Sequence, residues 1–332
     1  MITHSNIINA TDWAVDEMGI TSDDKMSQHP PLHFDLSTFD IYSAAKVGAS
    51  LYLVPEEFSL FPGQILKFME ERELTIWNSV PSVFVQMCLA RVVKPGRLPN
   101  VQKFFFNGEP FPGKFLAEWM RAFPEKQFVN MYGPTETTVQ CAFYVLKEIP
   151  KDSSWPPIGK ACRNVEVFVV SENGNLAGAE EEGELYVAGL GVGAGYWNDE
   201  EKTKKSFVEP PFLKNGSIVY KTGDLVKLRS DGNYEFVGRK DNQVKVRGNR
   251  IELGDVEKAF YSIPYVKESA VVALPDQLSG GSKLTAFLDV EKTNKADIIK
   301  KDLANLLPVY MIPDEIIFCR LFLFYFRPTT VL

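Results

Sequence analysis

The segment from Asn130 to Thr138 reads NMYGPTETT and combines a Gly-Pro turn with hydroxyl and carboxylate side chains. It follows an apolar run that is expected to form a strand. Such a turn can aim backbone N–H groups and threonine hydroxyls at phosphate oxygens, while Glu136 holds a Mg²⁺ ion that bridges them. An ordinary Gly-Pro turn with solvated Thr and Glu side chains is the alternative.

Two further groups of polar residues follow apolar runs. Asn107, Gly108 and Glu109 come directly after three phenylalanines, and Asp224 ends the segment YKTGD. Ligands of open α/β sheets commonly bind beyond the carboxyl ends of strands, so the first group is a candidate ligand site. The Asp224 carboxylate suits bidentate contact with vicinal ribose hydroxyls, and a strand-ending turn Asp is its alternative.

A basic stretch, GRKDNQVKVRGNRI, covers residues 238–251. In it Arg239, Lys245, Arg247 and Arg250 alternate with apolar and glycine positions. This stretch is a fourth candidate site segment, and a plain cationic edge strand would look similar.

The elements that must position these residues follow from the periodicity. Apolar runs and helical patterns alternate between residues 40 and 130; the runs are 49–54, 74–77, 103–106 and 127–131, and the helical stretches are 63–72, 83–90 and 113–123. This alternation predicts a parallel sheet covered by helices.

Beyond residue 160 the pattern changes. Residues 165–236 hold short β-branched runs separated by Gly-rich turns, which is typical of a small antiparallel sheet or distorted barrel. Residues 255–306 read as helix, strand, strand, helix, the pattern of a compact α+β unit, with a boundary near residues 239–241. We therefore predict an α/β fold with a helix-covered parallel sheet, a small β-barrel-like subdomain at about 160–238, and a small α+β C-terminal domain.

Composition narrows the function classes. The net charge of −7 gives no broad cationic surface, so nucleic acid is not an expected partner. The four cysteines lack CxxC spacing, which argues against a zinc site or a disulfide framework. The most apolar stretch, residues 316–326, contains Arg320 and is far shorter than the roughly 20 residues of a spanning helix. We expect no membrane association and a cytoplasmic location, since residues 1–10 resemble no secretory signal.

Taken together, the motifs resemble the adenylate-forming superfamily, which includes amino-acid adenylation domains of nonribosomal peptide synthetases, D-alanine:carrier protein ligases, acyl-CoA synthetases and luciferases. Six segments match family motifs in family order: FDLS at 34–37, YGPTE at 132–136, GEL at 183–185 with residues 189–198, YKTGD at 220–224, GRKDNQVKVRGNRIEL at 238–253, and LPVYMIP at 307–313.

The resemblance implies that a carboxylate attacks the α-phosphate of ATP to give an acyl-adenylate, after which the phosphopantetheine thiol of a peptidyl or acyl carrier protein accepts the acyl group. It implies the following roles: Tyr132 stacks on adenine, Asn107 to Glu109 line the adenine pocket, Gly133 and Thr135 contact phosphate, Glu136 binds Mg²⁺, Asp224 and Arg239 hold the ribose, Asp241 is a hinge, Lys245 serves the thioester step, and Arg250 supports phosphate binding.

Asp35 is the main indication of substrate class. In amino-acid adenylation domains the Asp of this motif pairs with the substrate α-ammonium, whereas acyl-CoA synthetases usually lack it. By position, six further residues should line the side-chain pocket: Leu36, Phe39, Phe105, Met131, Val139 and Gln140. Their bulk predicts a small or flat substrate.

Two departures from the family pattern shape the expected domains. The family's phosphate loop should precede Thr3, and a lysine-bearing segment should follow Pro313. We therefore expect a partial large N-terminal domain at 1–240, a small mobile but incomplete C-terminal domain at 241–317, an aberrant tail at 318–332, and weak or no activity. Acyl-CoA or aryl-acid ligation and a non-catalytic nucleotide- or partner-binding remnant are the alternatives.

The Asp35→Ala substitution separates amino-acid from acyl substrates. In an enzyme supplied with the phosphate loop and the lysine segment, it should abolish amino-acid-dependent ATP–pyrophosphate exchange, because the α-ammonium loses its charge partner. Exchange with an acid lacking the amine should be unaffected. Retention of amino-acid-dependent exchange by the variant would contradict the assignment.

Overall fold

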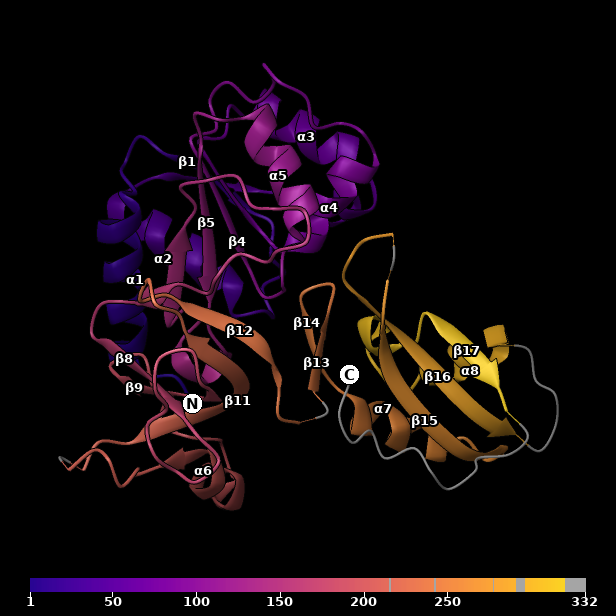
Figure 1. Ribbon diagram of the computed structural model, residues 1–332. Helices are drawn as coiled ribbons and strands as arrows, with labels where there is room; N and C mark the ends of the chain where they lie inside the picture. The colour runs from indigo at the N-terminus through magenta and orange to yellow at the C-terminus, as the bar shows by residue number, and fades with distance from the viewer. Residues whose placement is uncertain (215, 242, 277, 291–295, 320–332) are drawn as a thin grey trace. The chain divides into compact units, whose positions relative to one another are not determined.

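The computed structural model describes residues 1–214, 216–241, 243–276, 278–290 and 296–319. The predicted tail at 318–332 lies outside this part of the chain from residue 320 onward. The chain divides after Asp241 into two compact units, each with its own core (Figure 1).

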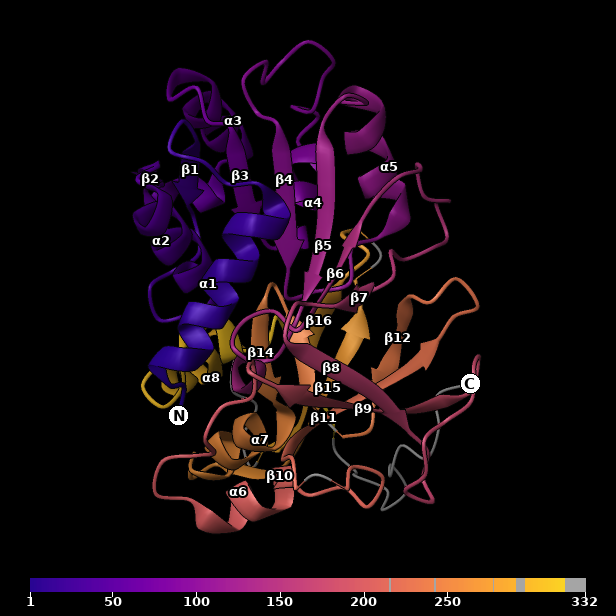
Figure 2. The ribbon, with the colours of Figure 1, turned by 90° about the vertical axis from the view of Figure 1, so that its left-hand side faces the viewer.

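The first unit contains a seven-stranded sheet in the order β2-β1-β3-β4-β5-β6-β7. Its strands are β1 Lys25–Gln28, β2 Ser50–Leu53, β3 Ile76–Ser79, β4 Lys103–Asn107, β5 Gln127–Tyr132, β6 Ala142–Val145 and β7 Lys160–Ala161. All pairings from β2 to β5 are parallel, and β6 and β7 join antiparallel at one edge. The predicted parallel sheet is confirmed (Figure 2).

Helices cover both faces of this sheet (Figure 1). One face carries α1 His4–Met18 and α2 Leu36–Val47, and the other carries α3 Pro62–Glu71, α4 Pro81–Leu89 and α5 Gly113–Ala122. Two 3₁₀ turns, η1 Glu56–Leu60 and η2 Thr135–Thr137, lie between these elements. The phenylalanine run in β4 shows why both faces are covered. Successive strand residues point to opposite faces, so Phe104 and Phe106 enter the cluster under α3–α5, whereas Phe105 enters the cluster under α1 and α2.

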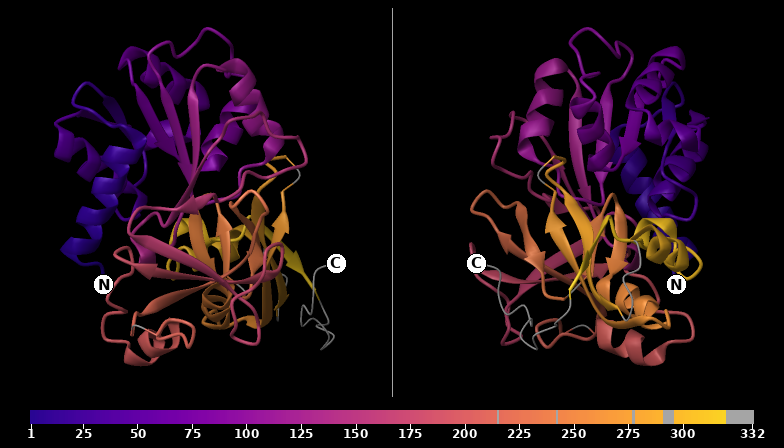
Figure 3. Two further views of the ribbon diagram at one scale, coloured as in Figure 1. Left: turned by 60° about the vertical axis from the view of Figure 1, so that its left-hand side comes forward. Right: turned by 90° about the vertical axis from the view of Figure 1, so that its right-hand side faces the viewer.

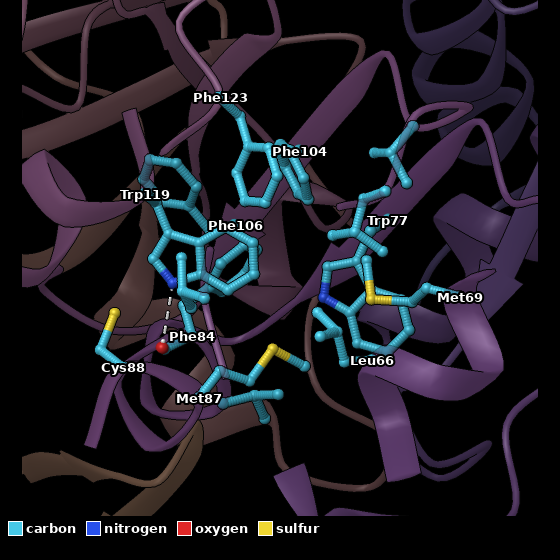
Figure 4. Packing of buried hydrophobic residues seen from close by; sticks show 14 of the residues in the cluster. Leu66, Met69, Trp77, Phe84, Met87, Cys88, Phe104, Phe106, Trp119 and Phe123 are labelled. Carbon is cyan, nitrogen blue, oxygen red and sulfur yellow. Dashed lines mark hydrogen bonds between the residues drawn. The ribbon is translucent and has the colours of Figure 1, made fainter. Parts of the chain in front are cut away.

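The cluster under α3–α5 is rich in aromatic side chains. Phe84 packs edge-on against Phe104, Phe106 and Trp119, with ring centroids 5.1–6.1 Å apart (Figure 4). The Trp119 indole donates a hydrogen bond to the Phe84 carbonyl at 3.1 Å, which satisfies its polar atom within the core. This cluster fixes α4 and α5 against the sheet.

A second sheet of the first unit is antiparallel throughout, in the order β10-β11-β9-β8, with β12 also paired to β11. It comprises β8 Val165–Val170, β9 Glu182–Gly189, β10 Phe207–Val208, β11 Val219–Leu228 and β12 Tyr234–Arg239, accompanied by α6 Glu200–Ser206. Of the two forms predicted for this region, the described strands show the antiparallel sheet.

The second unit is an α+β fold, as predicted. A hairpin of β13 Gln243–Val246 and β14 Asn249–Glu252 leads into α7 Leu253–Tyr261, β15 Val266–Pro275, β16 Ser282–Val290, α8 Ala296–Leu303, the 3₁₀ turn η3 Val309–Met311 and β17 Glu315–Phe318. Strand β16 is central, antiparallel to β15 and parallel to β17, and is drawn in yellow-orange in Figure 3. The core of the unit includes Ile251, Phe260 and Leu288.

In the described part of the chain, no helix combines the length and apolar character needed to traverse a bilayer.

A buried polar contact joins α2 to β3. Asn78 Nδ2 donates to Asp40 Oδ1 at 2.9 Å, and both side chains are fully buried. The other Asp40 oxygen has no hydrogen-bond partner among the described residues. Burial raises the pKa of the Asp40 carboxyl well above its ordinary value, although the Asn78 hydrogen bond acts in the opposite direction.

The Asp40→Asn substitution should flatten the pH dependence of stability. The pKa of Asp40 is raised in the folded state, so its protonated side chain contributes to the free energy of unfolding. This contribution is complete below the ordinary pKa near 3.8 and is lost as the pH rises through the folded pKa. Asparagine keeps the acceptor for Asn78 and does not ionise. Urea unfolding at a series of pH values should therefore show the free energy of unfolding of the variant rising relative to that of the wild type between pH 4 and pH 8. Parallel stability curves would contradict this account.

Candidate active site

Two predicted groups meet at the carboxyl edge of the parallel sheet. Asn107 ends β4 and Tyr132 ends β5, and in the register of these strands Asn107 lies opposite Met131. Gly108 follows in the left-handed region with φ of +94°, which glycine adopts without strain. Glu109 turns toward α4, where its Oε2 accepts the Ser82 backbone N–H at 2.9 Å. The edge of the sheet thus gathers the predicted adenine-pocket residues.

The loop after β5 has a tightly determined backbone. Cys141 N–H donates to the Tyr132 carbonyl at 2.8 Å, which closes the loop. A side chain at Gly133 would bring its Cβ within 2.6 Å of the Val139 carbonyl oxygen. Val139 itself has φ of +70°, which is strained for a β-branched residue and persists only where the surroundings enforce it. Thr135 is exposed and Glu136 is half-buried at the tip of the loop.

A hydrogen-bonded network connects this edge with the second sheet. Asp224 and Arg239 lie opposite each other on β11 and β12, and Arg239 Nη1 donates to Asp224 Oδ1 at 2.6 Å. The Tyr132 hydroxyl donates to the other oxygen of Asp224, whose carboxylate is only 4% exposed. Burial, followed by the nearby charge of Asp224, raises the pKa of Tyr132 well above its ordinary value, so the phenol remains a donor. Three predicted nucleotide-binding residues are therefore in contact.

Arg239 also binds the predicted hinge residue. Its Nε and Nη2 donate to the two carboxylate oxygens of Asp241 at 2.9 and 2.5 Å, a bidentate geometry. Burial alone would lower the pKa of Arg239, but the hydrogen bonds and charges of Asp241 and Asp224 raise it above its ordinary value. Gly223, with φ of +71°, leaves room for this guanidinium, because a Cβ there would lie 2.9 Å from Arg239 Nη2.

The predicted substrate-pocket residues form a largely buried group. The Phe39 and Phe105 rings meet edge-on, with centroids 5.6 Å apart, and Met131 belongs to the same core cluster. Leu36, Val139 and Gln140 are also buried. The Gln140 Nε2 has no hydrogen-bond partner among the described residues.

Asp35 lies at the N-cap of α2, directly before Leu36, and is half-buried. Its side chain makes no capping hydrogen bond to the helix. Its backbone carbonyl accepts the Thr38 hydroxyl at 2.6 Å, which fixes the first turn and thereby the point from which the Asp35 side chain leaves the helix.

Lys245 and Arg250 belong to the second unit. They lie directly opposite each other on β13 and β14. The hairpin therefore brings together Lys245, predicted to serve the thioester step, and Arg250, predicted to support phosphate binding. Like charges placed opposite one another on a sheet disfavour the pairing unless anionic groups are nearby.

The donor set fits a phosphate-bound Mg²⁺ ion. Within the residues that the structure describes, no group of three or more His, Cys, Asp and Glu side chains could hold a metal ion. Mg²⁺ in phosphoryl-transfer sites needs only one or two protein carboxylates, because phosphate oxygens and water complete its shell. Glu136, beside the exposed Thr135, is the carboxylate that the sequence predicts for this role.

Tyr196 is a site residue that the sequence reasoning missed. Its hydroxyl donates to Glu136 Oε1 at 2.7 Å across 60 positions of the chain. The only sequence signal was its place in the family-like segment 189–198, which assigns it no role. No local spacing could have paired it with Glu136.

Comparison with known proteins agrees with this geometry. Residues 1–197 match the family model described as AMP-binding enzyme, and residues 255–322 match the model of the AMP-binding enzyme C-terminal domain. The chain belongs to the AMP-binding enzyme family.

Among curated relatives, the L-proline--[L-prolyl-carrier protein] ligase of Pseudomonas fluorescens is 37% identical over 318 residues, which cover 95% of this chain and 61% of the ligase. Tyrocidine synthase 1 of Brevibacillus parabrevis is 30% identical, over 95% of this chain and 28% of its own length. The chain thus spans about three fifths or less of the length of these relatives.

Solved structures show the same fold. The adenylation domain AlmE of Vibrio cholerae, in complex with glycyl-adenosine-5'-phosphate, has a TM-score of 0.86 at 28% identity, covering 96% of this chain and 60% of AlmE. PA1221, a protein containing adenylation and PCP domains, has a TM-score of 0.79 at 25% identity, covering 91% of this chain and 51% of that one.

The crowding at Gly133 makes a testable prediction for stability. Gly133→Ala should lower the free energy of unfolding by about 1–3 kcal/mol, because the added methyl group forces the loop backbone apart. Gly63→Ala is the matched control: nothing lies within 4 Å of its Cβ position in α3, so it should be neutral or slightly stabilising. Urea unfolding of the two variants measures the difference, and equal stabilities would show that the loop is not under steric constraint.

Proposed function

We propose that this chain activates the carboxylate of an amino acid as an aminoacyl-adenylate at the expense of ATP, and that the complete enzyme transfers the aminoacyl group to a carrier-protein thiol. The observation that carries the proposal is the buried network of Tyr132, Asp224 and Arg239 beside the loop that bears Glu136. The similarity to an L-prolyl-carrier protein ligase of Pseudomonas fluorescens and to AlmE in complex with glycyl-adenosine-5'-phosphate supports the same chemistry.

In the first step, a carboxylate oxygen of the amino acid attacks the α-phosphorus of ATP, and pyrophosphate leaves. The ring of Tyr132 would stack on adenine next to Asn107, Gly108 and Glu109. The Asp224 carboxylate would accept hydrogen bonds from the ribose hydroxyls, with Arg239 balancing its charge.

The loop after β5 would hold the phosphates. Gly133 would allow the closely packed loop conformation that presents its backbone to the phosphates, the Thr135 hydroxyl would donate to a phosphate oxygen, and Glu136 would hold Mg²⁺. When bound, Mg²⁺ offsets the negative charge that develops on the transferring phosphoryl group. From the second unit, Arg250 would add a further cation for the phosphates.

Asp35 would select amino acids by pairing with the α-ammonium group. The bulky side chains of Phe39, Phe105 and Met131 leave room for a small side chain, with Leu36, Val139 and Gln140 completing the pocket. We infer a small substrate such as proline or glycine, which agrees with the substrates named for the Pseudomonas fluorescens and Vibrio cholerae relatives.

In the second step, the phosphopantetheine thiol of a peptidyl or acyl carrier protein would attack the aminoacyl carbonyl and release AMP. PA1221 combines adenylation and PCP domains, which supports this partner. Asp241 would act as the hinge for a mobile C-terminal unit, and Lys245 would serve this step. We further propose a cytoplasmic location, and the net charge of −7 argues against a nucleic-acid partner.

ATP–pyrophosphate exchange with matched acids tests the proposal. Proline or glycine should support exchange, whereas cyclopentanecarboxylate and acetate, which lack the amine, should support at least about 100-fold less because Asp35 then has no charge partner. The assay compares the chain with a version extended by the remaining region of the Pseudomonas fluorescens ligase. Equal exchange with the deaminated acids would support an acyl ligase, and no exchange in either version would contradict adenylation.

A further inference from the structure

The loop that bears Glu136 is bound along its length by a neighbouring segment, residues 191–196. The Thr138 hydroxyl donates to the Gly191 carbonyl at 2.7 Å. Gly193 N–H donates to the Glu136 carbonyl at 2.9 Å, and the Tyr196 hydroxyl donates to the Glu136 carboxylate at 2.7 Å. One segment therefore holds both the backbone and the side chain of Glu136.

Tyr196 is itself fixed by the elements around it. Its backbone N–H donates to Thr203 Oγ1 in α6 at 2.9 Å. The Tyr196 ring meets the Phe207 ring edge-on, with centroids 5.6 Å apart. The Lys202 ammonium lies 4.5 Å from the centroid of the Tyr196 ring. Gly195, with φ of +104°, allows close contact with Thr203, since a Cβ there would lie 2.5 Å from Thr203 Cγ2. These contacts fix the position of the Tyr196 side chain and therefore of its hydroxyl.

A hydroxyl held in this way can control a metal-binding carboxylate. Its hydrogen bond to Glu136 Oε1 favours one side-chain rotamer of Glu136 and so fixes the direction from which the carboxylate can meet a cation. Partners that hydrogen-bond to metal-binding side chains commonly change metal affinity by about 10–100-fold when they are removed.

We propose that Tyr196 is a positioning residue whose hydroxyl orients the Glu136 carboxylate toward the Mg²⁺ of bound Mg·ATP. This inference rests on the proposed function, because it takes Glu136 as the Mg²⁺-binding carboxylate. It assigns to the segment 191–196 the task of presenting that carboxylate at a fixed position before nucleotide binds.

A double-mutant cycle tests the proposal on the full chain. Isothermal titration calorimetry would measure ATP affinity over a series of Mg²⁺ concentrations for the wild type, Tyr196→Phe, Glu136→Gln and the double variant. Tyr196→Phe should weaken the Mg²⁺-dependent affinity by about 10-fold, and it should have no further effect in the Glu136→Gln background. Tyr144→Phe, which removes a hydroxyl from β6, is the matched control and should bind as the wild type does.

Two results would overturn the proposal: unchanged affinity in Tyr196→Phe, or an equal loss with and without Glu136, which would indicate a general structural role. If the wild type binds no ATP at any Mg²⁺ concentration, the proposed function fails instead. Nucleotide-free crystal structures then decide the role of Tyr196 separately. In Tyr196→Phe the Glu136 carboxylate should move to another rotamer while the loop backbone stays in place, and an unmoved carboxylate would refute the positioning role.

Discussion

The buried carboxylate of Asp224 is the contact on which the candidate site depends. It accepts hydrogen bonds from Tyr132 of the parallel sheet and from Arg239 of the antiparallel sheet, so one charged group joins the two sheets of the first unit. A buried charge of this kind is tolerated only when its partners are in place, because an unpaired carboxylate would pay the full cost of desolvation. The two sheets must therefore assemble in one relative position for the network to form.

Much of the parallel sheet could be predicted because its strands β3, β4 and β5 are apolar runs separated by helical patterns. Strand β1 shows the limit of that reasoning. Its sequence KMSQ contains one strongly apolar residue, and it becomes a strand because β2 and β3 pair with it on both sides. Strand formation of this kind depends on tertiary neighbours more than on the residues themselves.

The candidate site divides in the same way. Asn107 and Tyr132 could be placed near each other because parallel strands end at a common edge. The contact of Arg239 with Asp224 depends on the register of β11 and β12, and that of Tyr196 with Glu136 on the course of a long connection. Neither contact leaves a periodic trace in the sequence, so the family resemblance indicates roles for these residues but not which of their side chains touch.

The three phenylalanines of β4 have a consequence for how the edge of the site is specified. A strand usually finds its alignment through its alternation of apolar and polar residues, but three identical side chains carry no such information, and a shift by one position would bury nearly the same surface. The polar residues at the two ends must supply it. Lys103 donates to the carbonyls of Met18 and Gly19 at 2.7 Å each, which anchors one end of the strand. Because Lys103 is fixed at one end of β4, Asn107 is fixed at the other end, at the carboxyl edge that holds the candidate site. A lysine at the far end of the strand thereby sets the position of a candidate site residue.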